Sequence, residues 1–274
     1  MSGLSELGGG TVNTVTLDTN TGIVSKSFNN GNGIARSPKH RLQAEIYSLK
    51  KIPVAPNFLG CNSTTVHMQH LIGENNLDVV TQNKSESARN NIYRTAGISL
   101  AKIHSCNRQV CHEGQVGIHK SMAVNNIIKV NGRLAEKGIS TLQVIDYLNG
   151  GERRAEGCAK KTGLAWTYGD YWLNNLIGEI SRGGFKLNGV IDWELAQVDT
   201  PFVDYAVAYL SIERMYPESS KPFWKGYGFT PDEKTKKYFA VMKTLQWIAA
   251  DPQGDLNSDF YKDKIDFIKQ ETQK

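Results

Sequence analysis

The chain has 274 residues, which is enough for roughly two folding units of ordinary size. Hydrophobic residues make up 39% and charged residues 22%, so the composition excludes a largely disordered or fibrous protein. The net charge of +5 is modest and scattered, and we expect no nucleic-acid partner. The densest basic segment, residues 36–41, leaves a nucleic-acid patch open, but we interpret it as a solvated loop.

The amino-acid sequence shows no pattern of a membrane span or a secretion signal. No uninterrupted apolar stretch approaches the roughly 18 residues that cross a bilayer, so we expect no membrane partner. The first residues lack the basic and apolar regions of a signal peptide. Four cysteines fit no paired disulfide framework, which is typical of a reducing compartment. Together these features predict a cytoplasmic protein.

The first 72 residues are predicted to form a small β-rich lobe. The segment 8–28 begins with three glycines and continues with the strand, turn and strand composition of a β-hairpin. Apolar residues at helical spacing predict a helix over 41–51. Alternation of apolar and polar residues predicts a further strand over 64–71.

From about residue 84 the apolar spacing changes from strand-like to helical. A hairpin is expected within residues 176–191, where turn residues separate two β-rich runs. Thr230 and Pro231 are predicted to be the N-cap and the first residue of a helix. Helices are therefore predicted at 88–103, near 140–148, over 202–212, after Thr230 and at 258–270.

A buried ion pair is predicted in the first lobe. Lys26 shares its side-chain parity with Val24 and Phe28, so it falls on a mostly apolar strand face. A lysine in that position needs a partner, and Glu45 on the following helix is the natural one. A Lys–Glu pair beneath a glycine-rich hairpin can hold the phosphates of a nucleotide, whereas the alternative is a surface lysine on an edge strand.

A second cluster surrounds the hairpin at 176–191. The residues before its first strand and after its second strand lie at the same open end, so Asn175 and Asp192 can reach one small cation. An amide oxygen and a carboxylate suit magnesium, with phosphate oxygens and water completing the shell. Asp170, on the loop that leads in, is placed to accept a proton near the metal. The alternative is that all three are ordinary turn residues.

In this order the segments resemble the protein-kinase-like fold, and most closely the aminoglycoside phosphotransferase and choline kinase family. That family's catalytic loop commonly reads His-Gly-Asp-x-x-x-x-Asn, followed by Val-Ile-Asp-Trp. Here residues 168–175 are Tyr-Gly-Asp-Tyr-Trp-Leu-Asn-Asn and residues 190–193 are Val-Ile-Asp-Trp. Residues 198–206 are similar to the family's Gly-Asp-Pro-x-x-Asp-Leu-Ala, and residues 100–104 to its Leu-Ala-x-Leu-His. One departure is Tyr168, which stands where the family has a supporting histidine, and we expect activity to survive it.

The resemblance implies a bilobal α+β fold. Residues 1–72 would form the nucleotide-binding lobe and residues 73–274 a larger, mainly helical lobe. Asp170 would accept the hydroxyl proton, Asn175 and Asp192 would hold Mg²⁺, and Asp204 would brace the catalytic loop. ATP or GTP would be bound by Gly9, Gly10, Asn13, Lys26, Glu45, Gln69, His70 and Leu71.

The resemblance also implies transfer of a γ-phosphate to a hydroxyl of a small molecule, bound between residues 113–155 and the C-terminal helices. Residues 205–274 contain ten acidic and eleven basic side chains, which gives no support for a polycationic aminoglycoside. A sugar, an amino alcohol or an antibiotic remains open as the acceptor. The alternative function is a nucleotide-binding pseudokinase that acts as an interaction module. The preferred purine and the oligomeric state are not predicted.

Overall fold

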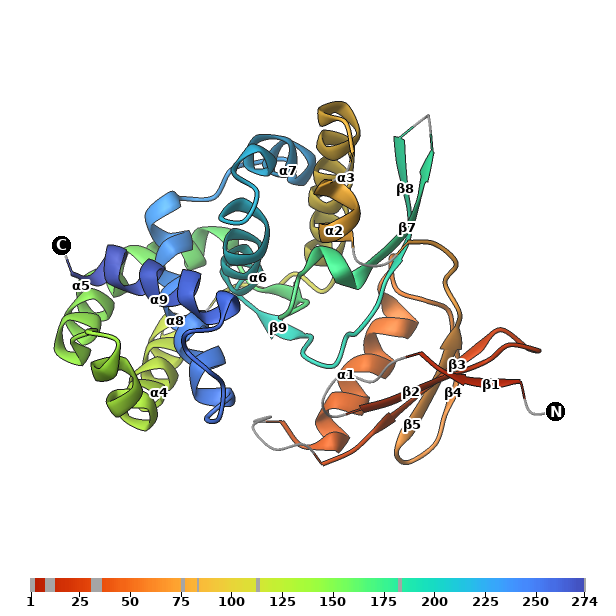
Figure 1. Ribbon diagram of the computed structural model, residues 1–274, viewed down its shortest axis with the longest axis horizontal. Coiled ribbons are helices and arrows are strands. Elements are labelled where there is room, and N and C mark those ends of the chain that lie inside the picture. The colour runs from red at the N-terminus through yellow and green to blue at the C-terminus, as the bar shows by residue number, and fades with distance from the viewer. Residues whose placement is uncertain are drawn as a thin grey trace.

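The computed structural model describes residues 3–7, 13–30, 36–74, 77–82, 84–111, 114–181 and 184–273. The predicted phosphate-contacting residues Gly9 and Gly10 lie outside these ranges. A small β-sheet with one helix forms one lobe, and a larger, mostly helical lobe lies beside it (Figure 1). The predicted α+β class with a small antiparallel-sheet lobe is confirmed.

The smaller lobe is built on a five-stranded antiparallel sheet with strand order β1-β2-β3-β5-β4. Apolar side chains on its inner face, among them Val24, Phe28 and Met68, pack against Leu42 and Leu49 of a helix, α1. The predicted hairpin and the strand near 64–71 are present, whereas β1 and β4 were not predicted because they are short and poor in alternation. The elements are β1 (Leu4–Glu6), β2 (Asn13–Asp18), β3 (Ile23–Phe28), α1 (Pro38–Lys51), β4 (Phe58–Cys61) and β5 (Thr65–Gln69).

The larger lobe is mainly helical. In its core α3 packs against α7, while α4 packs against α5 and α8. Two long helices, α4 and α5, fill the region in which the sequence predicted only one helix, near 140–148. The helices are α2 (Leu77–Gln82), α3 (Glu86–Ser105), α4 (Gln115–Glu136), α5 (Thr141–Thr162), α6 (Phe202–Ala208), α7 (Ser220–Tyr227), α8 (Glu233–Ala250) and α9 (Asp259–Thr272), with short turns η1 (Leu173–Asn175), η2 (Tyr209–Glu213) and η3 (Pro217–Ser219).

The start of α8 corrects the sequence prediction. Asp232, and not Thr230, is the N-cap, and its Oδ1 accepts the backbone N–H of Thr235 at 2.8 Å. Aspartate caps as well as threonine does, and Pro231, which has no N–H, fits the position before the cap. The helix therefore begins two residues later than the sequence pattern suggested.

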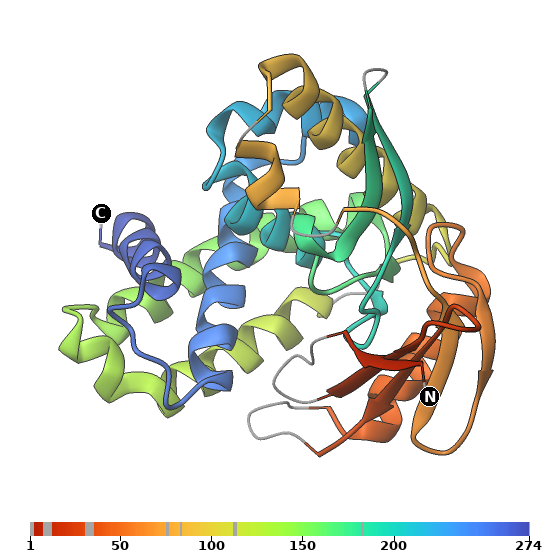
Figure 2. The ribbon, with the colours of Figure 1, turned by 45° about the vertical axis from the view of Figure 1, so that its right-hand side comes forward.

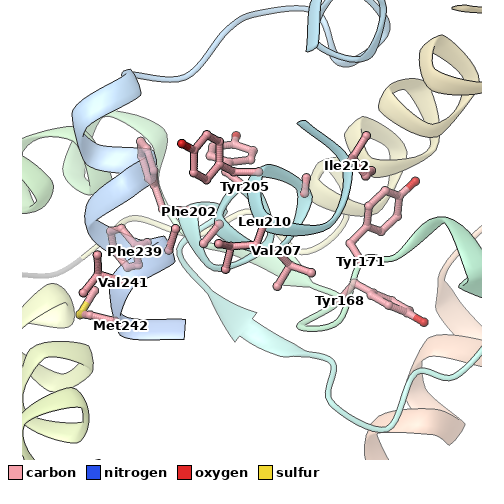
Figure 3. Close-up of a cluster of buried hydrophobic side chains, with 14 of the residues drawn as sticks. Tyr168, Tyr171, Phe202, Tyr205, Val207, Leu210, Ile212, Phe239, Val241 and Met242 are labelled. Carbon is pink, nitrogen blue, oxygen red and sulfur yellow. The ribbon is translucent and has the colours of Figure 1, made fainter. Parts of the chain in front are cut away.

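Two small antiparallel pairs support the polar loops of the larger lobe. The strand β6 (Ala165–Thr167) pairs with β9 (Gln197–Asp199), and β7 (Leu176–Ser181) pairs with β8 (Gly184–Val190) as the predicted hairpin. The hairpin rises beside α3, and the loop between β6 and β7 faces the sheet of the smaller lobe (Figure 2). Beneath that loop, the buried side chains of α6 and α8 form a continuous apolar cluster (Figure 3).

The connection between the lobes follows β5. Glu74 forms an isolated antiparallel bridge with Gly178 of the hairpin, so the chain has reached the larger lobe by residue 74. We propose that the boundary lies between residues 72 and 73. Within the described ranges, no helix combines the length and the apolar character that crossing a membrane requires.

Candidate active site

The loop that contains Asp170 is held by one buried carboxylate. Asp204, at the start of α6, accepts the backbone N–H of Tyr168 at 2.7 Å and that of Gly169 at 2.6 Å. Its Oδ2 also accepts from Nε2 of His104 at 2.8 Å, and the carboxylate is fully buried. A carboxylate can only accept hydrogen bonds here, so His104 carries a proton on Nε2. Asp204 thus contacts the loop directly, as a brace would.

Gly169 is required by the turn of this loop. Its φ is +86°, a left-handed conformation that favours glycine. A Cβ added there would lie 2.8 Å from the carbonyl oxygen of Leu195. Asp170 follows directly after this turn.

Tyr168 takes a structural position. Its ring is fully buried and meets the ring of Trp193 edge to face, with 4.9 Å between the centroids. Its hydroxyl donates a hydrogen bond to the carbonyl oxygen of Ile191. The side chain therefore links the loop of Asp170 to the segment that leads into Asp192.

We expect Tyr168→Phe to lower stability by about 1 kcal/mol, because one buried hydrogen bond is lost and the Ile191 carbonyl is left without this donor. Turnover should fall by less than tenfold, since the hydroxyl bonds to a backbone carbonyl and not to the Asp170 carboxylate. Denaturant unfolding and steady-state kinetics check both values. A loss of turnover comparable to that of an Asp170 variant would contradict a supporting role.

Asp170 lies between an indole and an ammonium group. Its Oδ1 accepts from Nε1 of Trp172 at 2.8 Å. The Nζ atom of Lys243, on α8, donates to the carbonyl oxygen of the preceding Gly169 at 2.9 Å. Burial raises the pKa of the Asp170 carboxyl to about 6, while the charge of Lys243 and the indole hydrogen bond oppose that rise. A carboxylate with such a pKa is ionised at pH 7 and is still able to accept a proton.

Asn175 and Asp192 meet at the open end of the hairpin, as predicted. Leu176 pairs with Val190, and the backbone N–H of Ile191 donates to the carbonyl oxygen of Asn175 at 2.9 Å. The amide nitrogen of Asn175 donates to the backbone oxygen of Asp170 at 3.0 Å, so its Oδ1 is the atom left to bind a cation.

Asp192 has the backbone and the exposure of a functional residue. Its φ of +67° is uncommon for a residue other than glycine, and such strain is often found at functional sites. Its side chain is 44% exposed, so water or a ligand can reach it. One carboxylate and one amide oxygen suit Mg²⁺ bound largely through phosphates and water. Within the described residues, no group of three or more His, Cys, Asp or Glu side chains could hold a metal by itself.

Lys26 joins the two lobes. It is only 5% exposed, forms an ion pair with Glu45 at 3.0 Å and contacts Asp192 of the larger lobe. Burial alone would lower the pKa of Lys26, but Asp192, Glu45 and Glu194 together hold it above its ordinary value. Burial raises the pKa of Glu45, and Lys26 opposes that shift. The predicted pair is therefore formed, and it includes a carboxylate from the other lobe.

We expect Lys26→Met to raise the nucleotide KM about tenfold or more, and Glu45→Gln to have a smaller effect of the same kind. Because the two side chains contact each other, the double variant should lose less than the sum of the two single losses. Nucleotide titrations of the parent, the two single variants and the double variant measure this coupling. Lys51→Met, at an exposed position of α1, the helix that contains Glu45, is the control. Additive losses would mean that the pair does not act as a unit.

Several charged groups around Lys26 and Asp192 were not predicted. Glu194 accepts from Asn13 and from Nη1 of Arg41, and its Oε2 lies 3.5 Å from Nζ of Lys26. Arg41 is fully buried, and Arg36 donates to the carbonyl oxygen of Ala196 at 3.2 Å. The interpretation of residues 36–41 as a solvated loop is therefore wrong for these two arginines. Local composition could not reveal this, because Ala196 and Glu194, which these arginines contact, lie more than 150 positions further along the chain.

The segment predicted to contact the purine, residues 69–71, begins at the last residue of β5. The backbone N–H of Gln69 donates to Asn57 and that of His70 donates to Gly22, both at 3.0 Å. Among the described residues, the backbone N–H of Leu71 has no hydrogen-bond partner. Of the three predicted amides, Leu71 is thus the one available to a base, and Asn13 is engaged with Arg41 and Glu194.

Comparisons with known proteins give the family and the fold. A family model described as the phosphotransferase enzyme family matches residues 65–236, which is more than half of the chain. A comparison with curated proteins gives no match.

Solved structures share the fold at low identity. The GDP complex of aminoglycoside 2'-phosphotransferase-IIIa has 11% identity and a TM-score of 0.67, over 98% of this chain and 92% of that one. A choline/ethanolamine kinase family protein from Mesorhizobium loti has 13% identity and a TM-score of 0.66, over 99% of this chain and 88% of that one. The streptomycin–ATP–APH(2'')-IIa ternary complex has 14% identity and a TM-score of 0.60, over 97% of this chain and 90% of that one.

These structures are similar to the chain in fold. The family match covers β5, the loop of Asp170, the hairpin and the start of α8. The chain belongs to the phosphotransferase enzyme family.

Proposed function

We propose that the protein transfers the γ-phosphoryl group of ATP or GTP to a hydroxyl group of a small molecule. The observation that carries this proposal is the contact of Lys26 with Asp192, because it joins the sheet lobe to the segment that follows the loop of Asp170 and Asn175. Family membership supports the reaction class. Complexes of structural neighbours with GDP and with ATP support a nucleotide co-substrate.

The reaction needs a proton acceptor beside the attacking hydroxyl. Asp170 would accept the hydroxyl proton while the oxygen bonds to the γ-phosphorus and the bond to the β-phosphate oxygen breaks. The nucleoside diphosphate is the leaving group. Trp172 holds Oδ1 of the Asp170 carboxylate through the indole N–H, and Oδ2 would be the atom that takes the proton.

The remaining groups bind the nucleotide. Asn175 and Asp192 would hold Mg²⁺, which when bound neutralises charge on the phosphates. Lys26 would contact the α- and β-phosphates, and Glu45 would hold its ammonium group in place. The backbone of residues 69–71 would contact the purine.

The acceptor would enter beside α8. A cavity of about 50 Å³ lies between α4, α6 and α8, and Lys243 forms part of its wall. This is the position that the sequence predicted for the acceptor, between residues 113–155 and the C-terminal helices.

A turnover screen tests the proposal. The protein is incubated with ATP or GTP, Mg²⁺ and a library of small hydroxyl compounds, and release of nucleoside diphosphate and phosphorylated product is measured. We expect magnesium-dependent transfer to at least one compound, with either purine. Tight nucleotide binding without any transfer would instead support the interaction-module alternative.

We expect Asp192→Asn to reduce magnesium-dependent nucleotide affinity by tenfold or more, because a negative charge is lost beside the largest local positive charge. Calorimetric titration of the nucleotide with and without Mg²⁺ measures the gain in each protein. The melting temperature should fall only modestly, since the replacement is isosteric and Glu45 and Glu194 still neutralise Lys26. Equal gains in the two proteins would show that Asp192 is not a ligand.

A further inference from the structure

A cavity of about 420 Å³ lies in the larger lobe, where the C-terminal ends of α3, α5 and α7 meet the starts of α6 and α8. This volume is in the range of about 300 to 1,000 Å³ that is typical of small-molecule sites. In the part of the chain that the structure describes, the cavity shares no lining residue with the one proposed above for the acceptor. None of the described residues proposed to bind the nucleotide or Mg²⁺ lines it either, so it is separate from the candidate active site.

Four aromatic side chains form a continuous wall of this cavity. Successive rings meet edge to face, with centroids 5.1 Å apart for Phe202 and Tyr205, 5.3 Å for Tyr205 and Tyr227, and 5.2 Å for Tyr227 and Phe229. Phe229 is 46% exposed, whereas the other three side chains are buried. A ligand ring that covers Phe229 would remove its apolar surface from water, which favours binding. The wall therefore suits an aromatic group.

The hydroxyl groups of the wall are already hydrogen-bonded. The hydroxyl of Tyr205 lies 2.6 Å from that of Tyr227, which lies 2.9 Å from Nδ1 of His104. Because His104 carries its proton on Nε2, Nδ1 of the neutral ring accepts from Tyr227. Asp204 lies behind this imidazole, where its charge acts on Lys243 and on two backbone N–H groups of the catalytic loop. The rings are thus held in place, and they offer aromatic surface to a ligand instead of free hydroxyl donors.

Two basic side chains line the cavity from neighbouring segments. Arg108 follows α3, and Lys161 belongs to the last turn of α5. Gln109 exchanges two backbone hydrogen bonds with Leu164, at 2.9 and 2.8 Å, which brings these segments side by side. The Nε atom of Arg108 donates to the carbonyl oxygen of His104 at 3.2 Å. Both basic side chains are exposed, and among the described residues no carboxylate forms an ion pair with either, so their remaining donors are open to an anion from solution.

One carboxylate also lines the cavity. Asp232 caps α8, and its Oδ1 accepts from the backbone N–H and the hydroxyl of Thr235 at 2.8 and 2.6 Å. These hydrogen bonds, together with the charges of Arg154 and Lys234, hold the pKa of Asp232 below its ordinary value. The described side chains that line the cavity therefore carry two positive charges against one negative charge. This balance favours an anion over a cation.

We propose that this cavity binds an aromatic carboxylate, with its ring against Phe229 and the tyrosines and its carboxylate bound by Arg108 and Lys161. The planar guanidinium group matches a carboxylate in geometry, and hydrogen bonds between charged groups are the strong ones. Aromatic rings prefer offset or edge-to-face contacts, which the wall provides. The site goes beyond the proposed phosphotransfer and does not depend on it.

Three ligands with the same two-ring body and different charge test the proposal. They are 2-naphthoate, the neutral 2-naphthamide and 2-naphthylmethylamine, which is protonated at pH 7. Calorimetric titration of the full chain measures each affinity. We expect one molecule of 2-naphthoate per chain, bound at least tenfold tighter than the amide or the amine. Equal or tighter binding of the amide or the amine, or a Kd for 2-naphthoate weaker than about 1 mM, would overturn the proposal.

Variants at exposed positions connect this binding to the cavity. Arg108→Met should weaken 2-naphthoate at least tenfold and 2-naphthamide less than twofold, because only the anion loses a charged partner. Phe229→Ala should weaken both ligands. The matched controls are Arg153→Met and Leu142→Ala, two exposed residues of α5 that do not line the cavity, and both should bind as the parent does. Losses in Arg153→Met as large as those in Arg108→Met would mean that the anion binds through general charge and not in this cavity.

A further comparison excludes the nucleotide site as the place of binding. Lys26→Met, and the parent with Mg²⁺ and ADP, should both bind 2-naphthoate as tightly as the parent alone. If either change abolishes binding while Arg108→Met retains it, the anion occupies the nucleotide site and the proposal fails. None of these measurements requires turnover, so a failure of the proposed phosphotransfer would leave them interpretable. Turnover of Arg108→Met should in turn stay within about twofold of the parent, because Arg108 is not part of the candidate active site.

Discussion

Asp170→Asn is expected to lower kcat by about 10² to 10⁴, the range typical for loss of a positioned proton acceptor. Asparagine keeps the size of the side chain and an oxygen that can accept from Trp172, but it cannot take the hydroxyl proton. Nucleotide affinity should change by less than threefold, because Asp170 does not contact Lys26 and is not a proposed metal ligand. Single-turnover kinetics and nucleotide titration separate the two effects.

The pH profile gives an independent measurement of the same group. Burial raises the pKa of Asp170 to about 6, so in the intact protein kcat/KM should fall as the pH drops through about 6 and the base becomes protonated. This limb lies above the range of an ordinary exposed aspartate, near 4. The residual activity of Asp170→Asn should not show this fall in kcat/KM near pH 6. The exposed Asp146→Asn on α5 is the matched control and should retain both rate and profile. A variant at position 170 with near-normal kcat would falsify the assigned role.

Asp204→Ala is expected to cost about 3–5 kcal/mol of unfolding free energy, as is typical when one partner of a buried charged network is removed. The change leaves the N–H groups of Tyr168 and Gly169 and the proton on His104 Nε2 without their acceptor. Because the two backbone groups belong to the catalytic loop, kcat should also fall. Denaturant unfolding measures the stability, and steady-state kinetics measure the rate at a temperature where the variant is folded.

Asp204→Asn separates the effect of the carboxylate's hydrogen bonds from the effect of side-chain volume. Its amide can accept through one oxygen only, and its NH₂ group would face a donor, so it should recover only part of the lost stability. Asp266→Asn, at an exposed position of α9, removes the same charge without a network and should stay within about 0.5 kcal/mol of the parent. If Asp204→Asn changes the unfolding free energy no more than that control does, the carboxylate does not hold the loop.

Local pattern predicted the parts of the site that depend on neighbours in sequence. Side-chain parity in β3 placed Lys26 on the apolar face, because alternate residues of a strand point to opposite sides. The turn predicted the hairpin and its common open end, whereas a bulge at Ile177 and Gly178 shifts the pairing by one residue, so that Asn175 bonds to Ile191 beside Asp192. The helical spacing of α3, α8 and α9 likewise indicated their buried faces, although the capping residue of α8 was misplaced.

Contacts between distant elements were not accessible in this way. Arg41 belongs to a basic segment that resembles a solvated loop, and only folding brings it to Glu194, 153 positions away. Lys243 looks like one more polar residue on an amphipathic helix until α8 packs behind Gly169, 74 positions earlier. The same is true of Lys264, whose aromatic neighbours come from the catalytic loop, α8 and α9.

The sequence by itself determined the order of the motifs, the sheet-and-helix division and the pairing of Lys26 with Glu45, because each depends on periodicity or on residues within a few elements of one another. The tertiary structure decided which charges surround Asp170. Their positions follow from helix packing over the whole larger lobe, and burial changes the pKa of each group only after that packing has removed water. For this reason the reaction class was predictable from the motifs, whereas the charged groups around Asp170 could be identified only in the folded protein.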